Sequence, residues 1–272
     1  ILTKMTEEGA DYMAALTEAQ ALGYAERDPT ADVEGFDAGA KAAIIASVAF
    51  GRKVVAGDVY HEGISRISKH DIAMATRLGY VVKLLGIVEG DREGNSVAVR
   101  VHPTLVPATH PLASVRESFN AVFVQGGAVG SLMFYGRGAG GDPTASAVLG
   151  DILDAARHLV SNTHTSLGSF VKATITPIDE TSSEYLISMD VADRPGVLHA
   201  VTGVFARHGV SIRAAEQEGN GPDARLVFLT HVAREADVQA TVRELRDLDV
   251  VRNVGSLLRV ICLLYTSDAA DE

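Results

Sequence analysis

The order of strand and helix patterns near the C-terminus restricts the fold of that region. Alternating apolar residues predict strands, and apolar residues at helical spacing predict helices. The predicted strands cover 185–191, 210–218, 225–232 and 250–260, and the predicted helices cover 197–208 and 236–245. The resulting order, βαββαβ, is that of the ferredoxin-like split unit. We therefore expect a ferredoxin-like domain over residues 184–261.

The chain before residue 184 mixes helices with strands that follow one another closely. Helices are predicted over 1–22, 37–50, 68–78 and 145–159, and strands over 81–89, 96–103, 121–125, 132–135 and 170–176. The turn-forming segment 90–95 joins two of these strands and predicts a β-hairpin. Ser68 and Asp71 form a capping-box pattern at a helix start. The segment 161–183 is rich in Ser and Thr, so we interpret it as a linker behind a first domain over 1–160.

The composition of the chain excludes several functional classes. Its formal net charge is -11 at pH 7, which argues against nucleic acid and anionic membrane as partners. The sequence contains no apolar run of about 18 residues that would span a membrane, and no signal peptide opens it. Cys262 is the only cysteine, and nine histidines lack ligand spacing, so we expect no disulfide and no metal site. These properties favour a cytoplasmic enzyme or metabolite sensor.

The two ends of the chain are unusual. Ile1 stands in place of an initiator Met, and an amphipathic pattern is already under way there, so we interpret the chain as a fragment that begins inside a domain. The tail CLLYTSDAADE, residues 262–272, resembles a translated adaptor sequence. We interpret it as an artefactual or disordered terminus.

Four charged residues between Glu26 and Lys41 form the candidate site. Asp37 and Lys41 are four residues apart at the start of an apolar helix, which places them on one helical face. Such pairs are common on surfaces and contribute only about 0.3 kcal/mol, so the spacing alone favours a solvent-facing pair. With Glu26 and Asp32 nearby, however, the group fits a site for a cationic small molecule that bears a carbonyl.

The segment from Ala19 to Lys41 resembles the signature of homoserine dehydrogenases. The shared positions are Gly23-Tyr24, Asp28-Pro29, Asp32-Val33, Gly35, Asp37 and Lys41, and similar segments follow at 80–86, 110–113 and 136–151. The resemblance covers residues 1–178. It implies an α+β substrate-binding and catalytic domain with a mixed or antiparallel sheet and helices on one face. It also implies that an N-terminal Rossmann domain is missing from this sequence.

The resemblance implies an activity and a role for each charged residue. Homoserine dehydrogenases interconvert aspartate 4-semialdehyde and L-homoserine with NADP or NAD, in threonine, methionine and isoleucine biosynthesis. Lys41 would then donate the proton and Asp37 would orient it, while Glu26 and Asp32 would bind the substrate ammonium. The cofactor would be bound mainly by the missing domain, so we expect the fragment alone to be inactive.

Two further positions in the first domain have two interpretations each. The glycine-rich segment 136–141 does not have Rossmann spacing. In the family Gly140 would touch the nucleotide, but a chain crossing that requires positive φ would also favour glycine there. His110 lies in a segment near the family's substrate pocket, and a structural hydrogen-bonding role is equally open.

The C-terminal residues 193–198 and 210–212 resemble an ACT domain. The turn Asp193-Arg194-Pro195-Gly196 lets the backbone approach a ligand at a helix start. Asp193 and Gly196 are therefore candidate effector-binding residues, and the family setting implies feedback by L-threonine and a homodimer or homotetramer. A ligand-free dimerisation module is the alternative for this domain. For the whole chain, the alternative is a non-catalytic amino-acid-binding ACT regulatory protein, which has no use for the Asp37–Lys41 group.

Overall fold

The structure is a computed structural model that describes residues 1–90, 95–163, 170–219 and 223–261. The expectation for residues 262–272 therefore lies outside the described residues, as does most of the hairpin turn predicted at 90–95. In the described residues, no helix is both long enough and apolar enough to cross a membrane.

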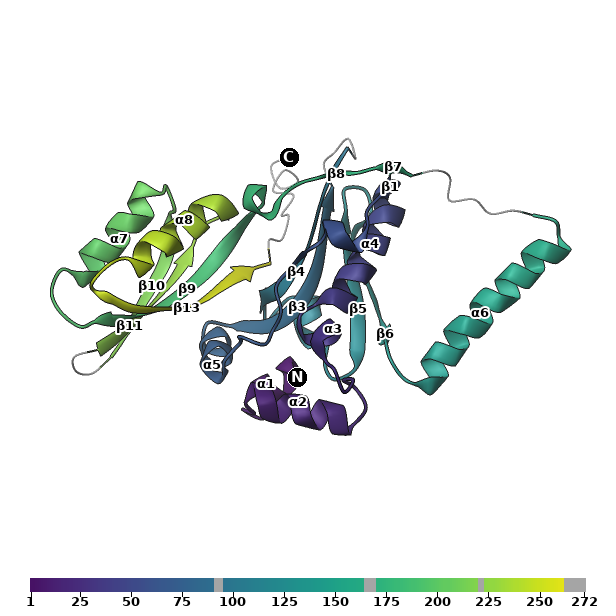
Figure 1. Ribbon diagram of the computed structural model, residues 1–272, viewed down its shortest axis with the longest axis horizontal. Coiled ribbons are helices and arrows are strands. Elements are labelled where there is room, and N and C mark those ends of the chain that lie inside the picture. The colour runs from purple at the N-terminus through teal and green to yellow at the C-terminus, as the bar shows by residue number, and fades with distance from the viewer. Residues whose placement is uncertain (91–94, 164–169, 220–222, 262–272) are drawn as a thin grey trace, which may run out of the picture.

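The N-terminal part begins with short helices and continues into long paired strands (Figure 1). Its helices are α1 (Leu2–Glu7), α2 (Tyr12–Ala21), α3 (Thr30–Val33), α4 (Phe36–Phe50), α5 (Lys69–Arg77) and α6 (Gly141–Val160). Its strands are β1 (Arg52–Lys53), β2 (Tyr60–His61), β3 (Tyr80–Gly90), β4 (Ser96–Pro107), β5 (Phe119–Gly126) and β6 (Gly130–Arg137). Short 3-10 turns are η1 (Ala56–Asp58) and η2 (Pro111–Ser114).

The C-terminal part has the predicted βαββαβ order. Two short strands, β7 (Val171–Lys172) and β8 (Thr174–Ile175), and the turn η3 (Ile178–Glu180) lead into it. It consists of β9 (Ser182–Ala192), α7 (Val197–Arg207), β10 (Ile212–Glu218), β11 (Asp223–Thr230), β12 (Ala233–Arg234), α8 (Glu235–Arg246) and β13 (Val251–Val260). The strand order β10-β11-β9-β13 is antiparallel throughout. The ferredoxin-like prediction is thus confirmed.

Strand β4 joins the two parts into one sheet. Along one edge it pairs antiparallel with β3, from Tyr80 opposite Pro107 to Gly90 opposite Val97, which confirms the predicted hairpin pairing. The other edge is shared by three parallel partners, each paired over two residues: β8, β2 and β13 pair with it in that order. The predicted α+β class with a mixed sheet is therefore confirmed, and β13 connects the C-terminal sheet directly to β4.

Helix α4 covers one face of β3 and β4 with its smallest residues. Ala42, Ala43 and Ala46 are buried, and they share a core cluster with valines of β4. On the facing strand, Gly86 allows α4 to approach closely, because a Cβ there would lie 3.3 Å from the Ala42 Cβ. The predicted helix 37–50 is confirmed. The face of α4 that points away from the sheet is exposed.

Two secondary-structure predictions were wrong. The single helix expected over 1–22 is two helices, because Gly9 has φ 65° and Asp11 caps a new start, its Oδ1 accepting from the Ala14 N–H at 2.8 Å. The single strand expected over 170–176 is divided, because β7 pairs with β1 and β8 pairs with β4. The Ser68–Asp71 capping box is confirmed in both directions.

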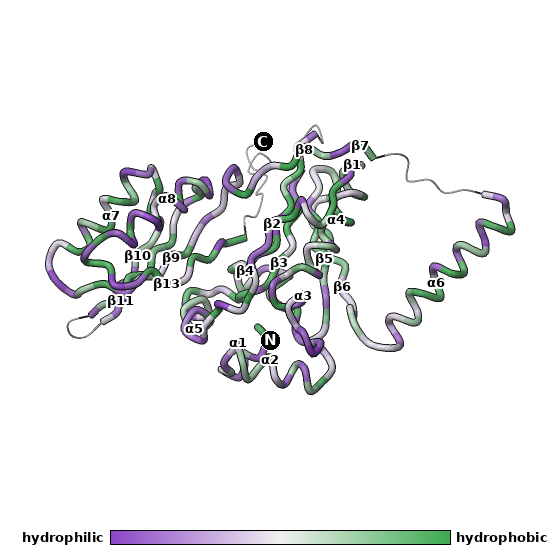
Figure 2. The backbone as a smooth tube through the Cα atoms, viewed as in Figure 1, coloured by the Kyte–Doolittle hydropathy of each residue, from purple (hydrophilic) through white to green (hydrophobic). Residues whose placement is uncertain are grey.

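Helix α6 stands away from the rest of the chain in Figure 1. It has no buried residue, and apolar side chains including Val148, Leu149, Ile152 and Leu153 are exposed along it. Figure 2 shows these hydrophobic positions as green stretches of the isolated tube. The hairpin β5–β6 forms a two-stranded sheet of its own.

Candidate functional site

The first two turns of α4 present Asp37 and Lys41 together. Gly35 precedes the helix with φ 80°, and Lys41 Nζ donates to Asp37 Oδ2 at 2.7 Å. The Lys41 side chain is 59% exposed, and the Asp37 side chain is 50% exposed. An exposed pair of this kind adds little stability. Its position therefore leaves an ammonium and a carboxylate available to a bound molecule.

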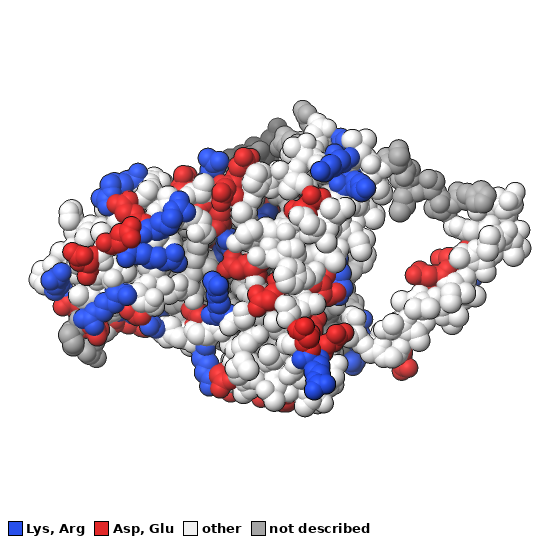
Figure 3. Space-filling model, viewed as in Figure 1, with Lys and Arg blue, Asp and Glu red and all other residues white. Residues whose placement is uncertain are grey.

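Glu26 and Asp32 lie on the elements that precede α4. Glu26 is exposed in the loop after α2, where Gln20 Nε2 donates to its backbone carbonyl at 2.9 Å. Asp32 is exposed in α3, which packs against α4. In the described part of the chain, neither carboxylate forms an ion pair. The structure thus joins Asp37 to Lys41 and leaves the other two carboxylates on adjoining elements; Figure 3 shows acidic side chains gathered over this region.

Asp28 has a structural role in the same loop. Its Oδ1 accepts from Thr30 Oγ1 at 2.6 Å and from the Thr30 N–H at 3.2 Å. These hydrogen bonds lower the pKa of the Asp28 carboxyl. Asp28 therefore holds the start of α3, the helix that carries Asp32.

The segment from Tyr60 to Ile64 lies directly behind these elements, and sequence reasoning missed it. The His61 ring fits against Gly39 of α4, where any side chain would overlap its Nε2 atom. A Cβ on Gly63 would likewise fall within 2.6 Å of the Val33 carbonyl oxygen, and the Ile64 N–H donates to that same oxygen at 2.8 Å. The segment thus contacts both α3 and α4.

A buried ionic group on the other side of β2 was also missed. Arg259 of β13 donates through Nε and Nη2 to the two carboxylate oxygens of Glu235, at 2.7 Å each, and through Nη1 to Glu62 Oε2 at 2.7 Å. Tyr185 Oη donates to Glu235 Oε2 at 2.9 Å. Burial opposes the charge on Arg259, but the two carboxylates raise its pKa overall. An arginine within the apolar run 257–260 was the available signal.

Gly140 is placed at the start of α6, away from Asp37 and Lys41. Its φ is 123°, a conformation that strongly favours glycine, so the conformational interpretation of this position is confirmed. Gly140 and Gly141 carry no side chain at this helix start. That geometry fits contact with a nucleotide phosphate, which binds backbone N–H groups at helix N-termini.

His110 is a buried capping residue. Its Nδ1 accepts from the Leu112 N–H at 3.1 Å, and its ring lies edge-on to Phe123 at 4.7 Å. Burial lowers the pKa of His110, so the ring stays neutral at pH 7. These contacts support the structural interpretation of His110.

The candidate effector residues line a cavity of about 450 Å³ in the C-terminal part. Asp193 and Gly196 face it together with Pro195, Leu198, Gln217 and Leu226. Gly196 begins α7 with φ 91°, and Gln217 Nε2 donates to Asp193 Oδ1 at 3.2 Å. Across the described ranges, no cluster of three His, Cys, Asp or Glu side chains could hold a metal ion.

Comparisons with known proteins match the N-terminal and the C-terminal part of the chain to two different families. The sequence model of the family described as homoserine dehydrogenase matches residues 1–153, and that of the ACT domain matches residues 185–250. Curated homoserine dehydrogenases from Corynebacterium glutamicum and Mycobacterium tuberculosis are 50% and 49% identical to this chain over 96% of its length. The chain spans 59% and 61% of the length of those two relatives.

Solved structures show the same likeness. A homoserine dehydrogenase from Thiobacillus denitrificans matches 96% of the chain with a TM-score of 0.89 and 37% identity. One from S. aureus at pH 7.5 matches 97% of the chain with a TM-score of 0.71 and 31% identity. In each case the match covers 61% of the solved chain.

Proposed function

The chain belongs to the homoserine dehydrogenase family, and from that premise we propose that it reduces L-aspartate 4-semialdehyde to L-homoserine with NADPH or NADH. The cofactor would be held mainly by the portion of the relatives that this chain does not span, with Gly140 contributing a backbone contact. The reaction serves threonine, methionine and isoleucine biosynthesis in the cytoplasm. On this proposal the chain by itself does not turn over.

The observation that carries the proposal is the exposed Asp37–Lys41 pair, joined at 2.7 Å on one face of α4. When bound, the nicotinamide supplies hydride to the aldehyde carbon. As that C–H bond forms, negative charge develops on the aldehyde oxygen, and the Lys41 ammonium stabilises it and donates the proton that completes the alcohol. Asp37 holds Lys41 toward the substrate through the observed hydrogen bond.

Glu26 and Asp32 complete the site as binding groups. Both carboxylates are exposed and lack an ion-pair partner among the described residues. The substrate's α-ammonium requires such acceptors, and charge-assisted hydrogen bonds are among the stronger polar contacts. Glu26 lies on the loop after α2, and Asp32 lies on α3, which packs against α4.

The C-terminal ACT domain supports a regulatory role. We assign Asp193 and Gly196 to a site for L-threonine, because the cavity beside them combines a carboxylate, an open helix start and apolar walls. We propose domain limits at 1–160 and 184–261 with a linker at 161–183, and assembly as a homodimer or homotetramer. The second candidate function, a non-catalytic amino-acid-binding regulator, rests on this same cavity.

The test is a paired measurement on the full-length protein. Oxidation of NADPH or NADH is followed with L-aspartate 4-semialdehyde as substrate, and L-threonine binding is measured by calorimetry. Substrate-dependent oxidation supports the dehydrogenase. Threonine binding without any oxidation supports the regulatory protein instead.

A further inference from the structure

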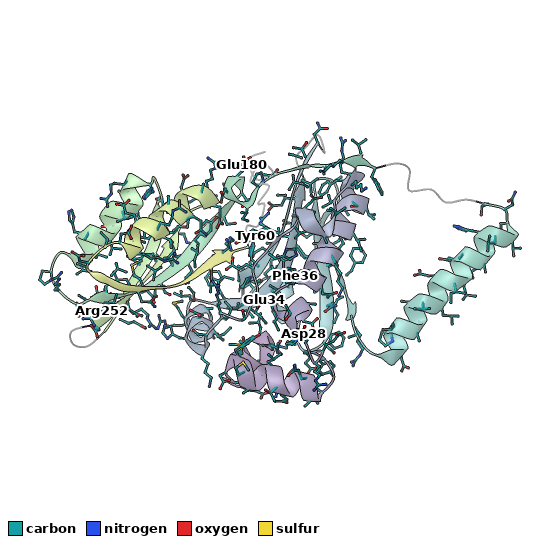
Figure 4. The ribbon with its side chains drawn as sticks, in the orientation of Figure 1. Asp28, Glu34, Phe36, Tyr60, Glu180 and Arg252 are labelled. Carbon is teal, nitrogen blue, oxygen red and sulfur yellow. The ribbon has the colours of Figure 1, made fainter. Side chains whose placement is uncertain are left out.

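The contacts behind α3 and α4 assign a role to a residue outside the candidate site. We propose that Glu62, held by Arg259 of the C-terminal part, is a positioning residue for the helices that carry Asp32, Asp37 and Lys41. The expected effect on catalysis rests on the proposed function of Lys41, whereas the effect of Glu62 on the position of α3 and α4 does not. Figure 4 labels Tyr60 between the end of β13 and the helices α3 and α4, where this connection is made.

Strand β2 sends neighbouring side chains in opposite directions, as a strand must. His61 lies on the α4 side and occupies the space that Gly39 leaves open. Tyr60 and Glu62 lie on the side of Arg259: the guanidinium carbon is 5.7 Å from the centre of the Tyr60 ring, and Nη1 is 2.7 Å from Glu62 Oε2. One short strand therefore contacts the candidate catalytic helix on one face and the C-terminal part on the other.

The residues after β2 extend this connection to α3. Gly63 packs against the backbone of Val33 and Glu34, and the Ile64 N–H donates to the Val33 carbonyl at 2.8 Å. The Glu62 N–H donates to the Val101 carbonyl of β4, also at 2.8 Å. The segment 60–64 is thus fixed to the sheet, to α3 and to α4 at successive residues.

Arg259 is a rigid anchor for Glu62. Its side chain is 2% exposed, and two of its three ionic hydrogen bonds form a bidentate pair with Glu235, which is 1% exposed. The Tyr185 hydroxyl and Gln239 Nε2 also donate to Glu235, at 2.9 and 2.8 Å. Because a bidentate buried pair has a single favourable geometry, it fixes the position of Arg259 Nη1, which donates to the Glu62 carboxylate.

Within the described ranges, the other charged side chains that link the two parts do not reach α3 or α4. Arg77 of α5 pairs with Glu216 at 3.1 Å and with Glu218, both on β10. Arg213 of β10 donates to Tyr80 Oη on β3 at 3.1 Å. These links connect the same two parts at a different place, so Arg77 offers a matched control for Glu62.

The experiment compares Glu62→Ala, Glu62→Gln and Arg77→Ala in the full-length protein. We expect Glu62→Ala to lower kcat by about tenfold with a smaller change in the semialdehyde KM, because small displacements of catalytic groups reduce rates strongly. Amide hydrogen exchange of residues 36–50 should accelerate in the same variant relative to residues 197–207. Glu62→Gln keeps an oxygen acceptor for Arg259 and should recover part of both effects, and Arg77→Ala should show neither.

Each other outcome overturns the proposal. Wild-type exchange over 36–50 in Glu62→Ala means that α4 does not depend on Glu62. Uniform acceleration over the whole chain, or equal effects in Arg77→Ala, means that Glu62 contributes general stability only. The exchange readout is independent of catalysis, so an active Lys41→Ala variant would refute the proposed role of Lys41 while exchange still decides the role of Glu62.

Discussion

Arg259 Nη1 lies 2.7 Å from Glu62 Oε2, although 197 residues separate the two in sequence. The contact crosses from the ACT-like C-terminal part to the strand beside α4. It places the C-terminal part of the chain one strand away from the helix that carries Asp37 and Lys41.

Replacing Arg259 with Met should destabilise the fold strongly. The substitution leaves Glu235 buried without its cation, and breaking a buried pair in this way costs about 3 to 5 kcal/mol. Urea unfolding followed by circular dichroism measures the change. The control is Arg157→Met, which removes an exposed pair with Asp154 on α6. Equal urea midpoints for the two variants would contradict the larger contribution assigned to the buried pair.

Lys41→Ala in the full-length protein should lower kcat by a factor of about 10² or more, the size of a typical acid–base contribution. Stability should change little, because the Asp37–Lys41 pair is exposed. Steady-state kinetics with L-aspartate 4-semialdehyde measures the effect. Lys69, exposed at the start of α5, is the control position; a normal kcat in Lys41→Ala would remove Lys41 from the mechanism.

Gly39→Ala should destabilise the chain even though alanine is the better helix former. A methyl group at Gly39 would overlap the His61 ring, and overpacking of this kind costs about 1 to 3 kcal/mol. Gly150→Ala in α6 meets nothing within 4 Å and should be neutral or stabilising by up to about 1 kcal/mol. The denaturant midpoint of Gly39→Ala should therefore fall, whereas that of Gly150→Ala should stay or rise; an unchanged or raised midpoint in Gly39→Ala would mean that the His61 ring moves aside freely.

His102 should make the fold less stable as pH falls below about 6.5. Burial lowers the pKa of His102 well below its usual value of 6.5, so the unfolded chain binds a proton that the folded chain excludes. The free energy of unfolding therefore rises with pH across that window and levels off above it. His102→Gln should reduce this slope between about pH 5 and pH 7, and an unchanged slope in that variant would contradict the assignment to His102.

Asp193→Asn should weaken L-threonine binding by about tenfold or more, since a hydrogen bond to a charged group contributes about 1.5 to 3 kcal/mol. Isothermal titration calorimetry on the full-length protein measures the affinity. Asp237→Asn, on the exposed start of α8, should bind normally. Unchanged affinity in Asp193→Asn would place the effector outside the cavity beside α7.

Local patterns in the sequence predicted most elements of the fold, including the α4 helix, the β3–β4 pairing and the βαββαβ order. The capping box at Ser68 was found because its hydrogen bonds join residues three apart. The break between α1 and α2 was missed although Gly9 and Asp11 were visible, because the apolar periodicity continues across them. Of the candidate residues, Asp37 and Lys41 are brought together as their spacing required.

The sequence by itself determined which residues share a helix face, which segments form strands and which family the charged segment resembles. These properties depend on residues within a few positions of one another, where backbone geometry alone sets the distance. Only the tertiary structure decided that His61 fills the space at Gly39, that β4 shares one edge among three strands, and that Arg259 holds Glu62. Those contacts join distant segments through packing and burial, and no local periodicity encodes them.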